Sequence, residues 1–185
     1  MKTFFARAFS LLSLITFLSA CTSLPSELTA QSEVLISDYS TWLNADPSLQ
    51  TDVRLGGVIA KVDNLATKSR IEVVNLPINK SGQPDITQDP QGRFIAYVPG
   101  YVEPVAFAQG RLVTFVGKTA MPEAGKVGEF DYTFPVMEAY GQRLWRIEER
   151  IIMNDFDRAF DNCRSFHCRA FDYGPREARV IQNVK

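Results

Sequence analysis

VRLGGVIAKV, at residues 53–62, carries more information about the architecture of this chain than any other segment. Its aliphatic and β-branched residues are typical of a strand, but Gly56 and Gly57 interrupt them. A glycine pair inside a strand indicates a β-bulge or a sharp bend. A strand that turns a corner in this way can pair at both ends of a small closed sheet. The segment therefore predicts the first strand of a strongly curved sheet.

Further short segments rich in β-branched or aromatic residues follow, at residues 70–77, 93–99, 111–117, 132–140 and 143–152. Two polar segments between them, 79–91 and 119–131, are expected to be loops. Because no long segment of helical period separates the strands, we expect an antiparallel sheet. Short strands of this kind must curl to hide their edges. We therefore predict a mostly β protein with a small antiparallel OB-like Greek-key β-barrel at residues 53–152, and a β-sandwich is the alternative.

The N-terminus has the features of an export signal. Lys2 and Arg7 precede an apolar block at residues 8–20, which is shorter than the roughly 20 apolar residues that a membrane span needs. The block ends in Leu18-Ser19-Ala20-Cys21, which resembles the lipobox of bacterial lipoproteins. This resemblance implies that residues 1–20 are removed as a signal peptide, that the Cys21 thiol receives a diacylglycerol, and that the new amino group receives a palmitoyl chain. An ordinary signal peptide with a chance cysteine is the alternative.

Several acyl chains on one residue give a stable membrane anchor, whereas a single chain gives only reversible binding. In bacteria with two membranes, an aspartate directly after the lipidated cysteine favours retention at the inner membrane. Here that position is Thr22. The resemblance therefore implies a lipid-anchored protein of the cell outer membrane, and it leaves open whether the protein faces the periplasm or the outside.

The mature chain is expected to have three parts. Residues 21–52 form a tether and N-terminal arm, in which residues 22–31 are the tether, and residues 53–152 form the barrel. In residues 153–185, arginines and acidic residues alternate with aromatic residues. We expect this C-terminal tail to pack on the barrel, with a surface for a partner as the alternative, and we expect residues 180–184 to add a final strand.

Two cysteines remain when Cys21 is lipidated. Because exported proteins fold in an oxidising compartment, Cys163 and Cys168 are predicted to form a disulfide that pins the tail. His167 lies beside Cys168 and gives the ligand types of a zinc site. Because His167 and Cys168 are adjacent, they are poorly placed to supply two ligands of one tetrahedral site. We therefore predict the disulfide and no metal.

The formal net charge of the chain is −1, and loss of Lys2 and Arg7 with the signal makes it more acidic. This charge argues against a nucleic-acid partner, which needs a basic surface. Neither a Gly-x-Ser-x-Gly nor a Ser-x-x-Lys motif occurs, so we expect no enzyme, no catalytic residues and no cofactor. Trp145 is expected in the core. The charged residues Arg93, Arg111 and Glu138 are expected to face solvent, with a buried ion pair at one end of the barrel as the alternative.

A series of short blocks then follows in a definite order: Leu55–Ala60, Glu72–Pro77, Gly92–Ala96, Val98–Tyr101, Gly110–Thr114, Gly128-Glu129, Pro135–Ala139 and Leu144-Trp145. In this order and spacing they resemble the Slp family of starvation-inducible outer-membrane lipoproteins. The resemblance implies an envelope lipoprotein linked to starvation and stress, and it brings no catalytic residues.

We therefore expect a non-enzymatic lipoprotein, held to the membrane by Cys21, with an interaction or structural role toward another envelope protein. The alternative is a module that binds a small ligand or an oligosaccharide, because OB-like barrels present a strand face and flanking loops to glycans. In that case residues 79–91 and 119–131 would form the walls of the binding groove.

Overall fold

The computed structural model describes residues 24–153 and 178–185. Cys21, Cys163, His167 and Cys168 lie outside these ranges. The short elements at the start are η1 (Ser26–Leu28), β1 (Leu35–Ile36), α2 (Tyr39–Leu43) and η2 (Pro47–Leu49). The longer strands are β2 (Asp52–Asn64), β3 (Lys68–Leu76), β4 (Gly92–Pro99), β5 (Leu112–Val127), β6 (Phe130–Trp145), β7 (Ile147–Met153) and β8 (Ala178–Val184). The prediction of a mostly β protein is confirmed.

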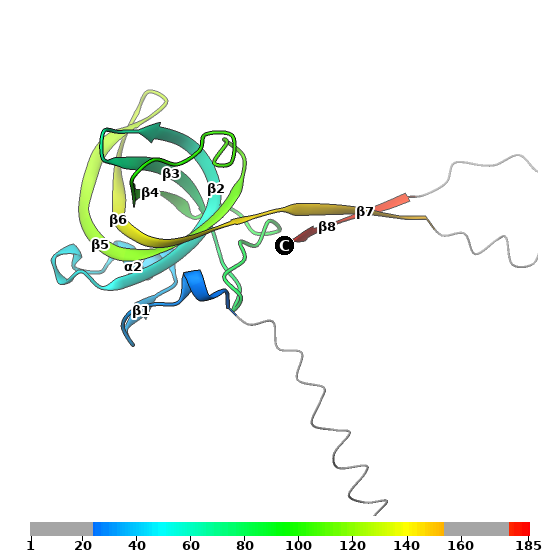
Figure 1. Ribbon diagram of the computed structural model, residues 1–185, viewed down its shortest axis with the longest axis horizontal. Helices are drawn as coiled ribbons and strands as arrows, with labels where there is room; N and C mark the ends of the chain where they lie inside the picture. Colours follow the sequence, from blue (N-terminus) through cyan, green and yellow to red (C-terminus); the bar gives the residue numbers. More distant parts are fainter. Residues whose placement is uncertain (1–23, 154–177) are drawn as a thin grey trace, which may run out of the picture.

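Strands β2, β3, β4, β6 and β5 are hydrogen-bonded in that order, and β5 pairs back with β2 (Figure 1). These strands form a closed ring of hydrogen bonds, here called the strand ring. The prediction of an antiparallel sheet is wrong for two pairings, because β4 runs parallel to β6 and β1 runs parallel to β2. The parallel pairing of β4 with β6 follows from the closure of the ring. Strands that alternate in direction cannot close a ring with an odd number of members, so at least one pair must be parallel.

The glycine pair lies where β2 is shared between two neighbours. Strand β2 pairs with β5 from Asp52 to Val58 and with β3 from Gly56 to Asn64. A Cβ at Gly57 would lie 1.9 Å from the carbonyl oxygen of Val74, so only glycine permits this approach. The glycine pair therefore lies where β2 pairs with both neighbours, as expected, but the irregular pairing with β3 falls later, between Ile59 and Lys61.

The predicted loop at residues 119–131 is wrong. Strand β5 continues to Val127 and β6 begins at Phe130, so the two strands form one long hairpin that turns at Gly128, with φ +62°. The polar composition of this segment made it look like a loop. Pro122 falls inside the irregular pairing between Ala120 and Glu123, where a strand residue needs no backbone donor.

The predicted strand at residues 143–152 divides into the end of β6 and a separate strand, β7. Strand β7 pairs with β8 in its own two-stranded sheet, so the final strand expected near the C-terminus is confirmed. This β7–β8 ribbon extends away from the strand ring (Figure 1). The described part of the tail therefore does not lie over the ring. Its base does contact the ring, because the side-chain amide of Gln83 donates to the carbonyl oxygen of Val184 at 3.1 Å.

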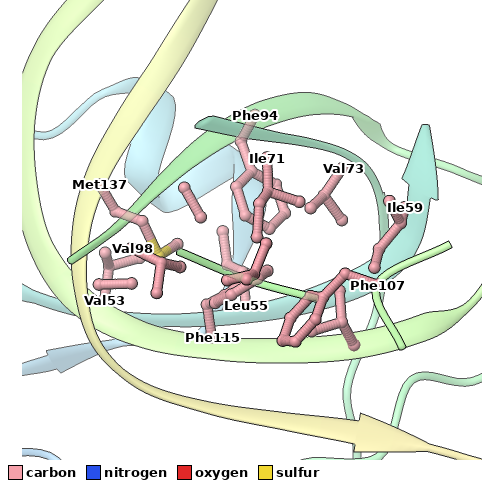
Figure 2. Packing of buried hydrophobic residues seen from close by; sticks show 14 of the residues in the cluster. Val53, Leu55, Ile59, Ile71, Val73, Phe94, Val98, Phe107, Phe115 and Met137 are labelled. Atoms are coloured by element: carbon pink, nitrogen blue, oxygen red, sulfur yellow. The ribbon is translucent and has the colours of Figure 1, made fainter. Parts of the chain in front are cut away.

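The main hydrophobic core fills the strand ring. Figure 2 shows Leu55, Ile71 and Phe115 converging on its interior, and all three are buried. Tyr39 and Trp42 of α2 pack against the same core, and Trp42 lies edge-on to Phe94 with ring centroids 5.6 Å apart. In the described residues, no helix is long and apolar enough to cross a membrane.

Candidate lipid-anchor site

The residues that follow the predicted acylation site are packed on the strand ring. Leu28 has no exposed surface and belongs to a second cluster with Leu76, Leu112, Val116 and Trp145. Leu24 packs against the same cluster. The prediction that residues 22–31 form a tether is therefore wrong from Leu24 onward. The sequence signal for this packing is the pair Leu24 and Leu28, four residues apart. The Ser, Thr and Pro residues around the pair made the segment look like a polar tether.

Two glycines allow this close packing. A Cβ at Gly141 in β6 would lie only 2.0 Å from the carbonyl oxygen of Glu27. A Cβ at Gly82 would lie 2.9 Å from Leu28 Cδ1 and 3.2 Å from Leu24 Cδ1. Distances below 3.0 Å cannot be accommodated without movement of one partner. The N-terminal segment thus rests on backbone that has no side chain at these points.

Polar contacts hold the segment from outside. The Arg143 guanidinium forms an ion pair with the Glu27 carboxylate and lies 4.8 Å from the centre of the Trp145 ring. The pKa of Glu27 is lowered, first by the hydrogen bond from its own backbone N–H and then by Arg143. From β2, Arg54 donates to the carbonyl oxygen of Leu28 at 3.1 Å. Because the Glu27 pair is exposed to solvent, its main effect is on geometry rather than on stability.

Asp52, the first residue of β2, fixes the next part of the segment. Its carboxylate is fully buried and accepts hydrogen bonds of 2.7 Å from the backbone N–H groups of Gln31 and Ser32. Lys118 Nζ lies 3.2 Å from the other carboxylate oxygen. Burial alone would raise the pKa of Asp52, but the Ser32, Lys118, Tyr140 and Gln31 hydrogen bonds outweigh it and lower the pKa. Reasoning from the sequence missed this role of Asp52.

These contacts limit how far the strand ring can lie from an anchor on Cys21. Only Thr22 and Ser23 separate Cys21 from Leu24, the first described residue. Three consecutive Cα–Cα steps span at most about 11 Å. An anchor on Cys21 would therefore hold the ring close to the membrane surface.

The hairpin of β5 and β6 packs on the outer face of β3 and β4. Phe134 from β6 is buried with Ile95 from β4 in a third apolar cluster. Glu123 from β5 accepts from Arg70 Nε at 3.0 Å and from the Tyr97 hydroxyl at 2.7 Å. The chain's own side chains thus occupy this face. Residues 119–131 are part of that hairpin and not a loop.

The other predicted wall, residues 79–91, packs beneath the strand ring. The Thr114 hydroxyl donates to the carbonyl oxygen of Gly82, and Thr114 Oγ1 accepts from Trp145 Nε1 at 2.9 Å. The core position predicted for Trp145 is confirmed, because it is only 3% exposed. Gly82 thus fixes this loop to β5.

The charged residues singled out from the sequence are separated. Arg93 pairs with Glu72 at 2.6 Å, and Glu138 pairs with Lys68 at 3.2 Å. Glu138 is exposed, as expected, and no ion pair joins Arg93 to Glu138 among the described residues. Within residues 24–153 and 178–185, no group of three or more metal-ligating side chains is present. The predicted lipidation and disulfide cysteines lie outside these ranges, so they stay predictions.

An export signal followed at once by a segment fixed to a mostly β body defines the class of an envelope lipoprotein. The chain matches the model of the outer membrane lipoprotein Slp family over residues 18–174 and belongs to this family. The resemblance noted from the sequence blocks is therefore confirmed. So is the predicted outer-membrane location.

Individual relatives agree with this assignment. The chain is 32% identical over 138 residues to the uncharacterized lipoprotein YeaY of Escherichia coli K12, covering 74% of this chain and 70% of that protein. It is 28% identical over 141 residues to the outer membrane protein Slp of the same organism, which covers 75% of this chain and 74% of that protein. An uncharacterized protein of Haemophilus influenzae is 41% identical over 96 residues, covering 51% and 52%. No solved structure matches the chain.

Proposed function

We propose that this protein is a non-enzymatic outer-membrane lipoprotein whose lipid, carried by Cys21, holds the strand ring directly against the bilayer. One observation carries the proposal: the packed part of the chain begins at Leu24, three residues after Cys21. In this proposal the signal peptide ends at Ala20, and Cys21 carries the S-diacylglycerol and the N-palmitoyl chain. The arm at residues 24–52 then belongs to the same domain as the ring.

We infer that the strand ring is an OB-like Greek-key barrel. The order β2, β3, β4, β6, β5 and the parallel pairing of β4 with β6 support this inference. OB-like folds bind glycans on the face that corresponds to β3 and β4. Here Phe134 and Glu123 from the β5–β6 hairpin pack on that face. This favours an interaction or structural role over oligosaccharide binding at that face.

The partners of two buried acids, Asp52 and Glu72, and of the half-buried Glu123 also favour a structural role. Asp52 binds the N-terminal arm, Glu72 pairs with Arg93, and Glu123 binds both Arg70 and Tyr97. Each of these carboxylates is held by partners that stabilise the fold. We infer that the protein works by contact with another envelope component under starvation or stress, the setting that the family resemblance implies.

Lipidation is tested by comparing Cys21→Ala with Cys163→Ala, the matched cysteine control, in cells given labelled palmitate. We expect Cys21→Ala to lose the label and leave the outer-membrane fraction, while Cys163→Ala keeps both. A labelled, membrane-bound Cys21→Ala protein would contradict the proposal.

The interaction role is tested separately by crosslinking the lipidated protein in starved cells and identifying its partners by mass spectrometry. We expect one abundant envelope protein to be crosslinked to it. If no protein is crosslinked above the level of an unrelated outer-membrane lipoprotein, the interaction role is contradicted.

A further inference from the structure

The β7–β8 ribbon has one mainly apolar face. Residues paired across the ribbon share a face, and successive pairs alternate between the two faces. The register therefore places Ile147, Ile151, Val180 and Val184 together, and we call this set the apolar ribbon face. Glu149 and Gln182 lie between them and bond to each other at 2.8 Å. The described side chains on the opposite face are Glu148, Arg150, Arg179, Ile181 and Asn183.

The apolar ribbon face is open along most of its length. Ile151 is 61% exposed and Val180 is 56% exposed. A two-stranded hairpin is only marginally stable by itself in water. The ribbon nevertheless extends from the strand ring without a described element over it (Figure 1). Its apolar side chains therefore need a partner that removes them from water.

The base of the ribbon lies beside the anchored end of the chain. Val184, the last member of the apolar ribbon face, packs against the same second cluster as Leu24. The 79–91 loop joins them as well, because Gly82 lies against Leu24 and Gln83 bonds to Val184. At the base, Arg146 and Lys185 exchange backbone hydrogen bonds of 2.6 and 2.8 Å. The apolar ribbon face thus begins on the side of the ring where the anchor attaches.

We propose that the apolar ribbon face lies on the membrane surface, with its side chains at the boundary between lipid headgroups and acyl chains. This inference rests on the proposed lipidation of Cys21. An anchor within about 11 Å of Leu24 keeps the ribbon base at the bilayer. The seven residues of each strand extend about 23 Å from that base.

Most of the charges fit this orientation; the exception is Glu149, which lies on the apolar ribbon face and accepts a 2.8 Å hydrogen bond from the Gln182 side-chain amide. On the opposite face, Glu148 bonds to Lys185 at 2.6 Å and lies near Arg150, so these groups stay in water when the apolar face meets lipid. Amphipathic elements bind membranes in this way, with the apolar side buried and the charged side solvated. A lipid surface is the partner that the anchor brings to this face.

The experiment uses the full lipidated mature chain in vesicles of phosphatidylethanolamine and phosphatidylglycerol, with or without bromine on the acyl chains. Ile151→Trp places a fluorescent reporter on the apolar ribbon face, and Arg150→Trp places the matched reporter on the opposite face. The native Trp42 and Trp145 are buried and give the background measured with the unsubstituted chain. Flotation of the vesicles first shows whether each protein is anchored.

We expect all three proteins to float with the vesicles. Brominated chains should reduce the added emission of Ile151→Trp by roughly half and leave that of Arg150→Trp nearly unchanged, because only the apolar side reaches the acyl boundary. If the proteins float but the two reporters are quenched equally, or neither is quenched, the orientation is wrong. If the emission of the Ile151→Trp tryptophan shows that it is shielded from water but not quenched by bromine, the face is covered by protein, either a second copy or residues 154–177, and the proposal is wrong. Failure of the unsubstituted chain to float would contradict the lipid anchor itself.

Discussion

The backbone N–H of Ser32 donates a 2.7 Å hydrogen bond to the buried carboxylate of Asp52. This bond joins the N-terminal arm to the first strand of the ring, and the N–H of Gln31 makes the same contact. Because Asp52 has no exposed surface, the charge depends on these donors and on Lys118 in place of water. The arm is therefore a part of the folded domain, and under the proposed lipidation of Cys21 it limits how far the ring can lie from the membrane.

Replacing Asp52 with asparagine should destabilise the protein. The Asp52→Asn variant loses the charge-assisted bonds from Gln31, Ser32 and Lys118, and such bonds contribute about 1.5–3 kcal/mol. Urea unfolding of the mature chain measures this loss. Asp89→Asn is the control, because Asp89 is exposed, and its unfolding free energy should change by less than about 0.5 kcal/mol. Equal effects of the two substitutions would show that Asp52 does not hold the arm.

The Asp52 carboxylate should also make the free energy of unfolding depend on pH. The folded-state pKa of Asp52 lies below the ordinary value of 3.8, so the unfolded chain takes up its proton first as the pH falls. The stabilisation is therefore fully present above the unfolded pKa and is lost as the pH falls through the folded pKa. Unfolding free energies measured from about pH 6 to about pH 2 should fall more steeply for the native chain than for Asp52→Asn. Parallel curves would contradict this assignment.

Truncation of Leu28 distinguishes a packed arm from a flexible tether. Leu28→Ala opens a cavity in the second cluster and should cost about 2–5 kcal/mol. Leu49→Ala is the control, since Leu49 is 71% exposed, and it should have little effect. The measurement is again urea unfolding. An unchanged midpoint for Leu28→Ala would mean that the segment after the anchor does not contribute to the fold.

The closure of the strand ring depends on Gly57. A methyl group there collides with the Val74 backbone, so Gly57→Ala should cost about 3 kcal/mol. Gly125→Ala is the comparison, because its added carbon meets only the edge of the Phe134 side chain, at 3.0 Å. Thermal unfolding should separate the two variants clearly. If Gly57→Ala is as stable as Gly125→Ala, β2 is not held between two neighbours at this point.

Cys163 and Cys168 are predicted to be joined in the exported protein. Alkylation of the purified, denatured chain without reductant should label neither residue, and treatment with a reductant should expose both. Mass spectrometry of the peptides that contain them gives the result. Labelling of both residues without reductant would rule out the disulfide.

Much of the strand pattern could be predicted from the sequence, because β-branched and aromatic residues mark strands locally. Gly56 and Gly57 correctly marked the part of β2 that pairs with two neighbours, and at Gly57 the Val74 backbone lies too close for any side chain. The polar composition of residues 119–131 misled the prediction, because local composition carries no information about pairing with a partner strand. The parallel pairing of β4 and β6 was missed for another reason: it follows from closure of the ring, which no single segment encodes.

Lipidation of Cys21 stays a prediction, which rests on the residues before it. The packing of Leu24 and Leu28 could not be predicted, because it depends on Gly82 and Gly141, which lie far away in the sequence. A polar segment after a lipobox looks like a tether unless those partners are known. The short distance that we propose between anchor and ring therefore rests on packing that only the three-dimensional structure shows.

Neutron reflectometry of the lipidated mature chain on a supported bilayer tests this short distance most directly. We expect the protein layer to begin at the lipid headgroups, with any intervening water layer no thicker than about 11 Å. A water layer of about 18 Å or more, the mean reach of a flexible tether over residues 22–31, would contradict the direct attachment of the ring to the membrane.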